Sequence, residues 1–332
     1  MSSALASTRR TFELHGIALG VCARDAAVLE ALELRLRDFA TGDGDAGERD
    51  PELRFEFVAG GISDPTPPSG TARPVYDTPH GTLHYFPAAD LLRGRLGGVE
   101  LRCEARRGVA RFESPSYDGR DLYLATHPLA TISLMELLER RGLFALHAAC
   151  LSTADRRGVL LAGASGAGKS TLALALVHAG LRFLSDDIVF LLARDDSDDA
   201  VRVLGFADTI GLTEHAADRF PALRARCAQP PAPGYPKRLH RIEDLFEEPA
   251  LPDCRPNVLV FPEVSPEHPS DIAPLDPGAA LLRLVPDVLL TDPAATQAHL
   301  RAIASLVGQV RCYTLRSGFD LERAADLVAA LL

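Results

Sequence analysis

The chain contains 332 residues, of which 47% are hydrophobic and 24% charged. These values are typical of globular proteins, and the length is enough for two domains of ordinary size. The net charge of −10 argues against nucleic acid or an anionic membrane as the main partner. No stretch reaches the roughly 18 apolar residues of a membrane span, and residues 1–10 contain no apolar segment of signal-peptide length. We therefore expect a cytoplasmic protein.

The cysteines and lysines are both informative. The six cysteines are far apart in the sequence and form no C-x-x-C pair, so we expect free thiols in a reducing compartment. Of the 35 basic residues only two, Lys169 and Lys237, are lysine. Because the chain uses arginine almost everywhere else, each lysine is a candidate for a role that needs a compact ammonium group.

Residues 1–120 predict a small α+β domain with an antiparallel sheet. The pattern predicts a helix at 24–40 and strands at 11–23, 53–58, 74–76, 82–86, 99–103 and 109–112. This part of the chain contains no catalytic motif. Its role stays open between a scaffold or homo-oligomer contact and the recognition of a substrate.

Residues 121–332 predict a second, α/β domain. Helices are expected at 121–141, 170–178, 214–226, 277–286, 293–308 and 320–332, and strands at 143–151, 158–162, 181–184, 188–192, 201–211, 257–261 and 311–316. The acidic stretch 194–199 is interpreted as a solvated turn. The proline-rich stretch 228–236 excludes a helix or a central strand and predicts a loop, which is a candidate lid.

The segment Gly163–Ser170 reads Gly-Ala-Ser-Gly-Ala-Gly-Lys-Ser and matches the phosphate-binding loop pattern at every fixed position. A predicted strand precedes it and a helix follows, so backbone N–H groups at a helix N-terminus would surround an anion. In such a loop Lys169 reaches the β- and γ-phosphates and the Ser170 hydroxyl binds Mg²⁺. The residues expected to contact the nucleotide are Gly163, Ala164, Ser165, Gly166, Ala167, Gly168, Lys169, Ser170 and Thr171.

An acidic pair, Asp186 and Asp187, follows the next short strand, 16 and 17 residues after Ser170. This spacing allows one helix, one turn and a strand that returns beside the loop. Adjacent residues at a strand end point to opposite sides. We therefore predict that one carboxylate completes the Mg²⁺ site with Ser170 and that the other faces the acceptor hydroxyl as general base. In the alternative, only Asp186 is functional and Asp187 is a turn residue.

Three further residues are weaker candidates. His147 stands in the apolar strand before the loop and is either a core histidine or a group that faces the nucleotide or the substrate. Lys237 and Arg238 follow the proline-rich loop and are candidates to bind the phosphoryl group in transfer.

The segments Leu146-His-Ala-Ala149, Gly158–Ser170 and Leu184-Ser-Asp-Asp187 resemble the bacterial HPr kinase/phosphorylase family. The chain is more similar to the shorter HPr-kinase-like serine kinases, some of which modify ribosomal peptide precursors. The resemblance covers about residues 143–192, and Tyr235–Arg238 and 258–262 fit loosely. It implies a P-loop kinase domain with a mixed sheet flanked by helices. In such a domain ATP, or in some members another phosphate donor, supplies the phosphoryl group, and a serine hydroxyl accepts it. The residues that it places at the active site are His147, Lys169, Ser170, Asp186 and Asp187.

These observations favour an ATP- and Mg²⁺-dependent kinase that phosphorylates a serine or another hydroxyl of a peptide, protein or small molecule. Ala164 and Thr171 stand where HPr kinases commonly carry acidic residues, so the resemblance leaves phosphorylase activity, HPr as the acceptor and a hexameric assembly open. One alternative is a nucleotide-binding regulatory or adaptor module that transfers no phosphate; it would need a Mg²⁺ ligand but no second carboxylate. Another is a mechanical P-loop ATPase, whose additional parallel strands and water-positioning residue are not evident in the sequence.

Overall fold

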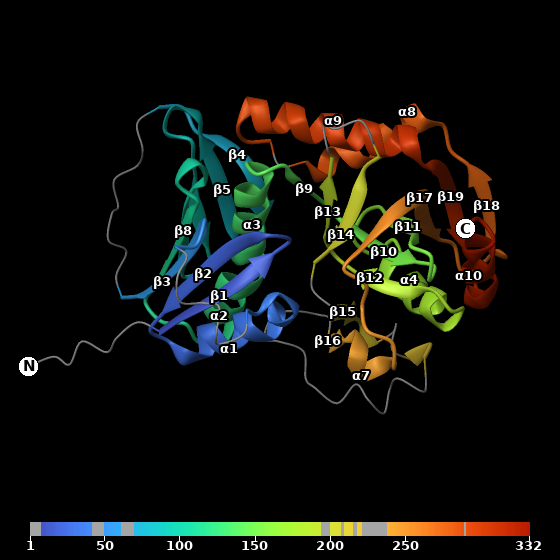
Figure 1. The fold of residues 1–332 in the computed structure, drawn as a ribbon, viewed down its shortest axis with the longest axis horizontal. Helices are drawn as coiled ribbons and strands as arrows, with labels where there is room; N and C mark the ends of the chain where they lie inside the picture. The colour runs from blue at the N-terminus through green and yellow to red at the C-terminus, as the bar shows by residue number, and fades with distance from the viewer. Residues whose placement is uncertain are drawn as a thin grey trace, which may run out of the picture. The chain divides into compact units, whose positions relative to one another are not determined.

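The computed structural model describes residues 8–41, 50–60, 70–193, 200–206, 209–214, 218–220, 238–288 and 290–332. The chain divides into two compact units, Met1–Arg141 with Leu289–Thr296 and Gly142–Val288 with Gln297–Leu332 (Figure 1). The predicted turn at 194–199, most of the predicted helix at 214–226 and the predicted loop at 228–236 lie outside the described residues. In the part that is described, no helix combines the length and the hydropathy needed to cross a bilayer.

The first unit is built on an eight-stranded sheet. Its strands are β1 (Thr8–Leu14), β2 (Ile17–Ala23), β3 (Leu53–Ala59), β4 (Arg73–Thr78), β5 (Gly81–Phe86), β6 (Leu91–Leu96), β7 (Val99–Glu104) and β8 (Val109–Ser114), in the order β1-β2-β3-β8-β7-β6-β5-β4. The predicted single strand at 11–23 is a hairpin, because the chain turns at His15 and Gly16, which have φ of 52° and 90°.

The expectation of an antiparallel sheet in this unit is wrong, because the sheet is mixed. Strand β3 runs parallel to β2 on one side and parallel to β8 on the other. Helix α1 (Ala26–Arg35) lies between β2 and β3 in the chain, and a crossover of this kind allows parallel pairing. The strands from β4 to β8 form the antiparallel part.

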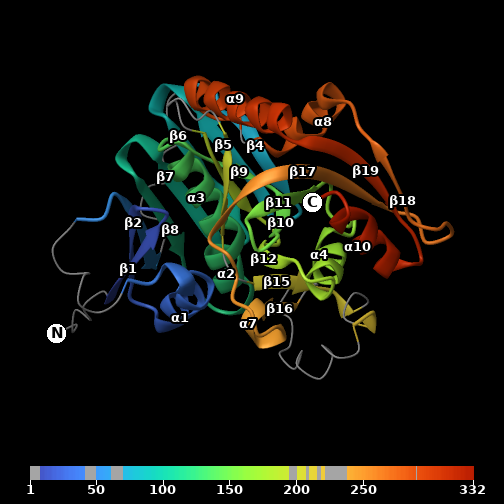
Figure 2. The same cartoon turned by 45° about the vertical axis from the view of Figure 1, so that its right-hand side comes forward.

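The predicted helix at 121–141 is interrupted. It consists of α2 (Gly119–Leu124), a π-helical turn over Ala125–Leu129 and α3 (Ala130–Glu139). Pro128 lies inside the turn and has no N–H to donate, which explains the local change in hydrogen-bond spacing. These helices lie along the sheet of the first unit (Figures 1 and 2). The compact unit therefore extends to Arg141, whereas the sequence placed a boundary at 120.

The second unit contains a nine-stranded mixed sheet and a separate two-stranded sheet. The large sheet has the path β12-β10-β11-β17-β14-β13-β9, and β19 pairs with β17 and with β18. Its strands are β9 (Leu143–Leu146), β10 (Ala148–Ser152), β11 (Arg157–Ala162), β12 (Arg182–Ser185), β13 (Val189–Leu192), β14 (Arg202–Gly205), β17 (Asp253–Val264), β18 (Asp271–Pro274) and β19 (Arg311–Ser317). The small sheet pairs β15 (Thr209–Leu212) with β16 (Arg238–Arg241).

Helices cover both faces of the large sheet (Figure 2). The described helices of this unit are α4 (Lys169–His178), α7 (Ile242–Leu245), α8 (Pro277–Leu284), α10 (Leu321–Ala329) and, from Gln297 onward, α9 (Pro293–Gln309). Alternate residues of β11 face opposite sides: Val159 and Leu161 pack with α4 and α10, and Leu160 packs with α8 and α9. A strand buried on both faces reads as a continuous apolar run, which the sequence shows. This arrangement agrees with the predicted α/β class, a mixed sheet flanked by helices.

Candidate functional site

The strand register brings three distant segments to one place. Strand β10 pairs with β11 so that Ala148 lies opposite Ala162, and therefore His147 and Gly163 lie at the same end of this pair. Strand β12 pairs with β10, and β13 pairs with β9, with Val189 opposite Leu146. His147 connects β9 to β10, and residues 186–188 connect β12 to β13. These two connections lie next to each other, beside the glycine-rich loop.

The glycine-rich loop, residues 163–168, takes a conformation that its glycines make possible. Gly163, Gly166 and Gly168 have φ of 141°, 85° and 91°, a region that residues with a Cβ rarely adopt. Gly168 is the N-cap of α4 and offers no side chain to the N–H groups of the first turn. A helix N-terminus of this kind favours an anion.

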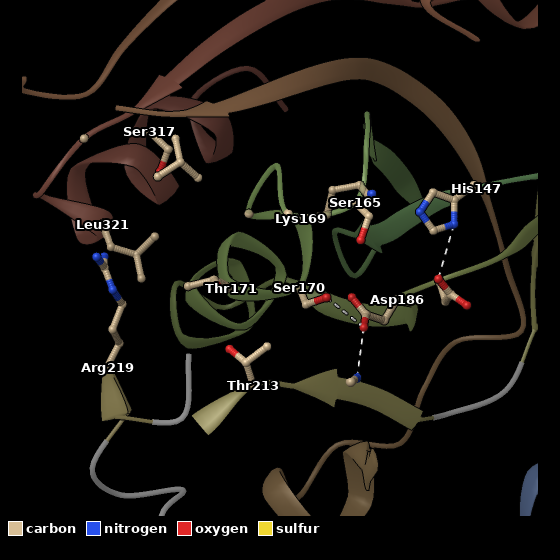
Figure 3. Close-up of a pocket in the computed structure, with 16 residues that line it drawn as sticks. His147, Ser165, Lys169, Ser170, Thr171, Asp186, Thr213, Arg219, Ser317 and Leu321 are labelled. Carbon is tan, nitrogen blue, oxygen red and sulfur yellow. Dashed lines mark hydrogen bonds and ion pairs between the residues drawn. The ribbon is translucent and has the colours of Figure 1, made fainter. Parts of the chain in front are cut away.

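Lys169, the first residue of α4, is held against this loop. Its side chain is buried, and Nζ donates hydrogen bonds to the carbonyl oxygens of Gly163, at 2.6 Å, and Ala164, at 3.2 Å. The ammonium group therefore sits at the start of the loop, at the edge of a cavity (Figure 3). From this position it can form a charge-assisted hydrogen bond to an anion in the loop.

Asp186 lies beside Ser170 and is 4% exposed. One of its carboxylate oxygens, Oδ2, accepts hydrogen bonds from Ser170 Oγ and from the backbone N–H of Gly211, both at 3.0 Å (Figure 3). The turn that presents it is fixed by Ser185, whose hydroxyl contacts the carbonyl oxygens of Ile188 and Phe206 at 2.6 and 2.8 Å. The acidic residue is therefore placed by buried hydrogen bonds on both sides.

The Ser170–Asp186 pair has a geometry that fits Mg²⁺. Neighbouring ligands of an octahedral Mg²⁺ with bonds of about 2.0–2.1 Å lie about 2.9 Å apart. The 3.0 Å between Ser170 Oγ and Asp186 Oδ2 is close to this value. Among the described residues, no group of three or more His, Cys, Asp or Glu could hold a metal ion by itself. A Mg²⁺ ion bound here would take its other ligands from phosphate oxygens and water, as is usual for this ion.

Asp187 occupies a different environment from Asp186. Its side chain is 54% exposed, and its Oδ1 lies 3.2 Å from Nδ1 of His147, whose side chain is 37% exposed (Figure 3). His147 is therefore a partly exposed residue that faces a carboxylate, and the interpretation as a core histidine does not hold. The two neighbouring aspartates contact different partners, although both lie in the bend after β12 and not in a strand, so the alternation along a strand is not the cause.

These groups line one cavity of about 440 Å³, within the usual range for small-molecule sites. The predicted residues that line it are His147, Ser165, Gly166, Gly168, Lys169, Ser170, Thr171, Asp186 and Asp187. The other predicted loop residues, Gly163, Ala164 and Ala167, complete the loop without lining the cavity. Lys237 and the side chain of Arg238 lie outside the described part of the structure, so their role stays a prediction.

Sequence reasoning missed a second group of lining residues: Gly211, Thr213, Arg219, Val264, Ser317, Gly318 and Leu321. Val264 and Ser317 are the last residues of β17 and β19, which run parallel to β11 and end at the same edge of the sheet. Ligands bind at this edge in many α/β sheets. Predicting these residues from the sequence would have required the order of the strands, which the sequence pattern alone does not give.

No family model matches this chain, and no curated protein matches it. Among solved structures, the HPr(Ser) kinase/phosphatase from Coxiella burnetii matches 37% of the chain, with 18% sequence identity and a TM-score of 0.26. The match spans 60% of that protein, which is less than two thirds of its length.

Proposed function

We propose that this protein is an ATP- and Mg²⁺-dependent kinase that transfers the γ-phosphoryl group to a hydroxyl of a peptide, protein or small molecule. The observation that carries the proposal is one cavity that holds a glycine-rich loop with a buried lysine, a hydroxyl–carboxylate pair and a second, exposed carboxylate. Phosphoryl transfer needs a phosphate cradle, a metal site and a group that accepts or orients the acceptor proton. Each of these three parts has a candidate here.

The loop and Lys169 would hold the phosphates. The uncapped N-terminus of α4 favours negative charge, and Lys169, whose Nζ lies at the start of the loop, would reach the β- and γ-phosphates. Ser170 and Asp186 would hold Mg²⁺, which neutralises charge on the phosphates when it is bound. In this assignment Lys169 can exchange its carbonyl partners for phosphate oxygens without leaving the loop.

Asp187 would be the general base. Its exposed carboxylate can accept the proton of an approaching hydroxyl, whereas Asp186 is buried and already bonded to Ser170 and Gly211. The acceptor oxygen then attacks the γ-phosphorus, the bond from that phosphorus to the bridging oxygen breaks, and ADP leaves with the bond electrons. His147 positions Asp187 through the 3.2 Å contact of Nδ1 with Oδ1.

Transfer of labelled phosphate tests the proposal. The purified protein is incubated with Mg²⁺, γ-³²P-ATP and fractions of a lysate of its source organism, and Asp187→Asn is compared with Asp271→Asn. Asp271 is an exposed aspartate of β18 that pairs with Arg316, so it serves as a matched control. We expect an acceptor that is labelled by the wild type and by the control but not by Asp187→Asn.

Two results would contradict parts of this proposal. If the wild type binds ATP but labels nothing in any fraction, the chain is a nucleotide-binding regulatory or adaptor module. If Asp187→Asn labels the acceptor at the wild-type rate, the protein is a kinase but Asp187 is not its base.

A further inference from the structure

The cavity has two chemically different ends. His147 lies on one side of the Ser170–Asp186 pair, and Thr171, Arg219, Leu321 and Ser317 are drawn on the other side (Figure 3). The first end also contains Asp187 and is therefore polar and acidic. The second end consists of residues that the kinase mechanism above does not use.

The second end is partly apolar and contains an arginine. Leu321 begins α10, and Val264 at the end of β17 is 55% exposed, although it is a large aliphatic residue. Arg219 is exposed, and among the described residues it takes part in no salt bridge. Exposed apolar side chains in a cavity indicate a ligand that covers them.

This end continues directly from the glycine-rich loop. Strands β17 and β19 pair so that Val264 lies opposite Ser317. A Cβ placed on Gly168 would lie only 3.1 Å from Cγ2 of Val264, so Val264 packs against the last residue of the loop. The apolar surface is therefore next to the point where the loop enters α4.

We infer that this second end, formed by Val264, Leu321 and Arg219, binds the nucleoside part of the nucleotide. The inference depends on the proposed function and adds the position and orientation of the nucleotide to it. The three residues form the nucleoside subsite.

The direction of the loop supports this orientation. In a phosphate-binding loop the lysine contacts the β- and γ-phosphates, and the backbone cradles the α- and β-phosphates. Lys169 Nζ lies at Gly163 and Ala164, at the start of the loop, while Thr171 is the third residue of α4 and follows Ser170. The nucleoside, which is attached to the α-phosphate, therefore extends past Thr171 toward Leu321. The γ-phosphate then faces the end with His147 and Asp187.

The chemistry of the subsite matches a nucleobase better than a hydroxyl acceptor. Aliphatic side chains pack on the faces of a heteroaromatic ring, and a guanidinium group stacks on such a ring. An acceptor hydroxyl must instead approach in line with the bond that breaks, from the side of the γ-phosphate. With the nucleoside at Leu321, that approach leads past Asp187.

Two ligands separate the subsite from the phosphate site. We would measure the Kd of Mg-ATP and of Mg-tripolyphosphate by isothermal titration calorimetry for the wild type, Leu321→Ala and Arg219→Lys. Tripolyphosphate occupies the loop but has no nucleoside. The control variant is Leu327→Ala, a partly buried leucine of α10 that is not among the lining residues, which reports any loosening of the helix.

We expect Leu321→Ala to raise the Kd of Mg-ATP about 10-fold through lost apolar contact. Arg219→Lys should raise it about 3-fold through lost stacking. Neither variant should change the Kd of tripolyphosphate, and Leu327→Ala should change the Kd of neither ligand.

The inference is overturned if both variants bind Mg-ATP as the wild type does, or if they raise the Kd of Mg-ATP and of Mg-tripolyphosphate by the same factor. In those cases tripolyphosphate binding by the wild type still supports the proposed phosphate site. If the wild type binds neither ligand, the proposed function itself fails, and the subsite with it.

Discussion

Positive charge that is buried or half-buried occurs in both units of the molecule, but its surroundings differ. In the first unit Arg140 contacts three carboxylates: Glu136 at 2.6 Å, Asp90 at 2.9 Å and Asp292 at 3.5 Å. In the second unit Lys169 donates to two backbone carbonyl oxygens and lines a cavity. The side chain of Arg140 is 13% exposed and Lys169 is 8% exposed, so burial alone does not separate the two cases.

The comparison shows what distinguishes a structural charge from one directed at a ligand. A buried cation that is surrounded by carboxylates of its own chain has its charge already neutralised, and removing it leaves those carboxylates uncompensated. An ammonium group that donates to the carbonyl oxygens of a loop beside a cavity lies where an anion in that cavity can reach it. Substitutions in both units can test this difference.

The largest effect on stability is expected for Arg140→Met. This change removes the cation that Asp90, Glu136 and Asp292 share and leaves Asp90 with Arg106, at 2.9 Å, which costs about 3–5 kcal/mol of the free energy of unfolding. Urea unfolding followed by circular dichroism measures this difference. A loss below about 1 kcal/mol would show that the cluster does not hold the first unit together.

Because Glu136 belongs to the same cluster and has a raised pKa, we expect the stability of the protein to depend on pH. Burial is the main cause that raises the pKa of this carboxyl from 4.5 to about 7; Glu139 and Asp90 raise it further, and Arg140 and Thr291 act in the opposite direction. Because the folded state holds the proton more tightly, the stabilisation is complete below pH 4.5 and is lost as the pH rises through about 7. The change is on the order of 3 kcal/mol.

Glu136→Gln should remove this dependence. Unfolding free energies of the wild type and the variant, measured from pH 4.5 to 8, should differ by an amount that changes steadily up to about pH 7. Equal slopes in the two proteins over that range would show that Glu136 is ionised throughout.

A smaller effect is expected for Gly168→Ala. The φ of 91° at this position costs a residue with a Cβ about 1–2 kcal/mol, and the new Cβ would press on Val264. Gly142→Ala is the matched control, since Gly142 has a φ of 79° and nothing within 4 Å of its added Cβ. Both variants should lose similar stability, but only Gly168→Ala should bind Mg-ATP more weakly. Equal ATP affinity in the two variants would contradict a role for the loop.

The smallest effect is expected for Arg283→Met. Arg283 and Glu263 form a salt bridge of 3.0 Å between side chains that are 41% and 62% exposed. Solvent screens such a pair, so the unfolding free energy should change by less than about 1 kcal/mol. A loss as large as that of Arg140→Met would show that the contrast between buried and exposed charge does not apply to this protein.

The sequence predicted best those features that have a local cause. The loop, the helix after it and the acidic pair follow from residues within about 25 positions of one another, and the structure places them around one cavity. His147 was harder to interpret, because its position depends on the pairing of β9 with β13 and of β10 with β11. The function of these residues stays a prediction.

Features that depend on strand order were missed. The alternating pattern at 11–23 continues through the turn at His15 and Gly16, so a hairpin reads as one strand. The parallel pairing of β3 in the first unit could not be derived from the alternation of apolar and polar residues. A strand with one face toward solvent shows the same alternation whether its neighbour is parallel or antiparallel. Val264 and Leu321 carry no chemical motif, and only the parallel order of β11, β17 and β19 brings their loops to the cavity.

The most direct test of the account is the binding of Mg-ATP to the wild type and to Lys169→Met, measured by calorimetry together with urea unfolding. We predict that the wild type binds Mg-ATP and that the variant binds at least about 100-fold more weakly, because it loses a charge-assisted contact to the phosphates. Its unfolding free energy should fall by less than that of Arg140→Met, because the change leaves two neutral carbonyl oxygens, and not carboxylates, without this donor. A wild type that does not bind Mg-ATP, or a variant that binds it equally well, would contradict the assignment of this cavity to a nucleotide.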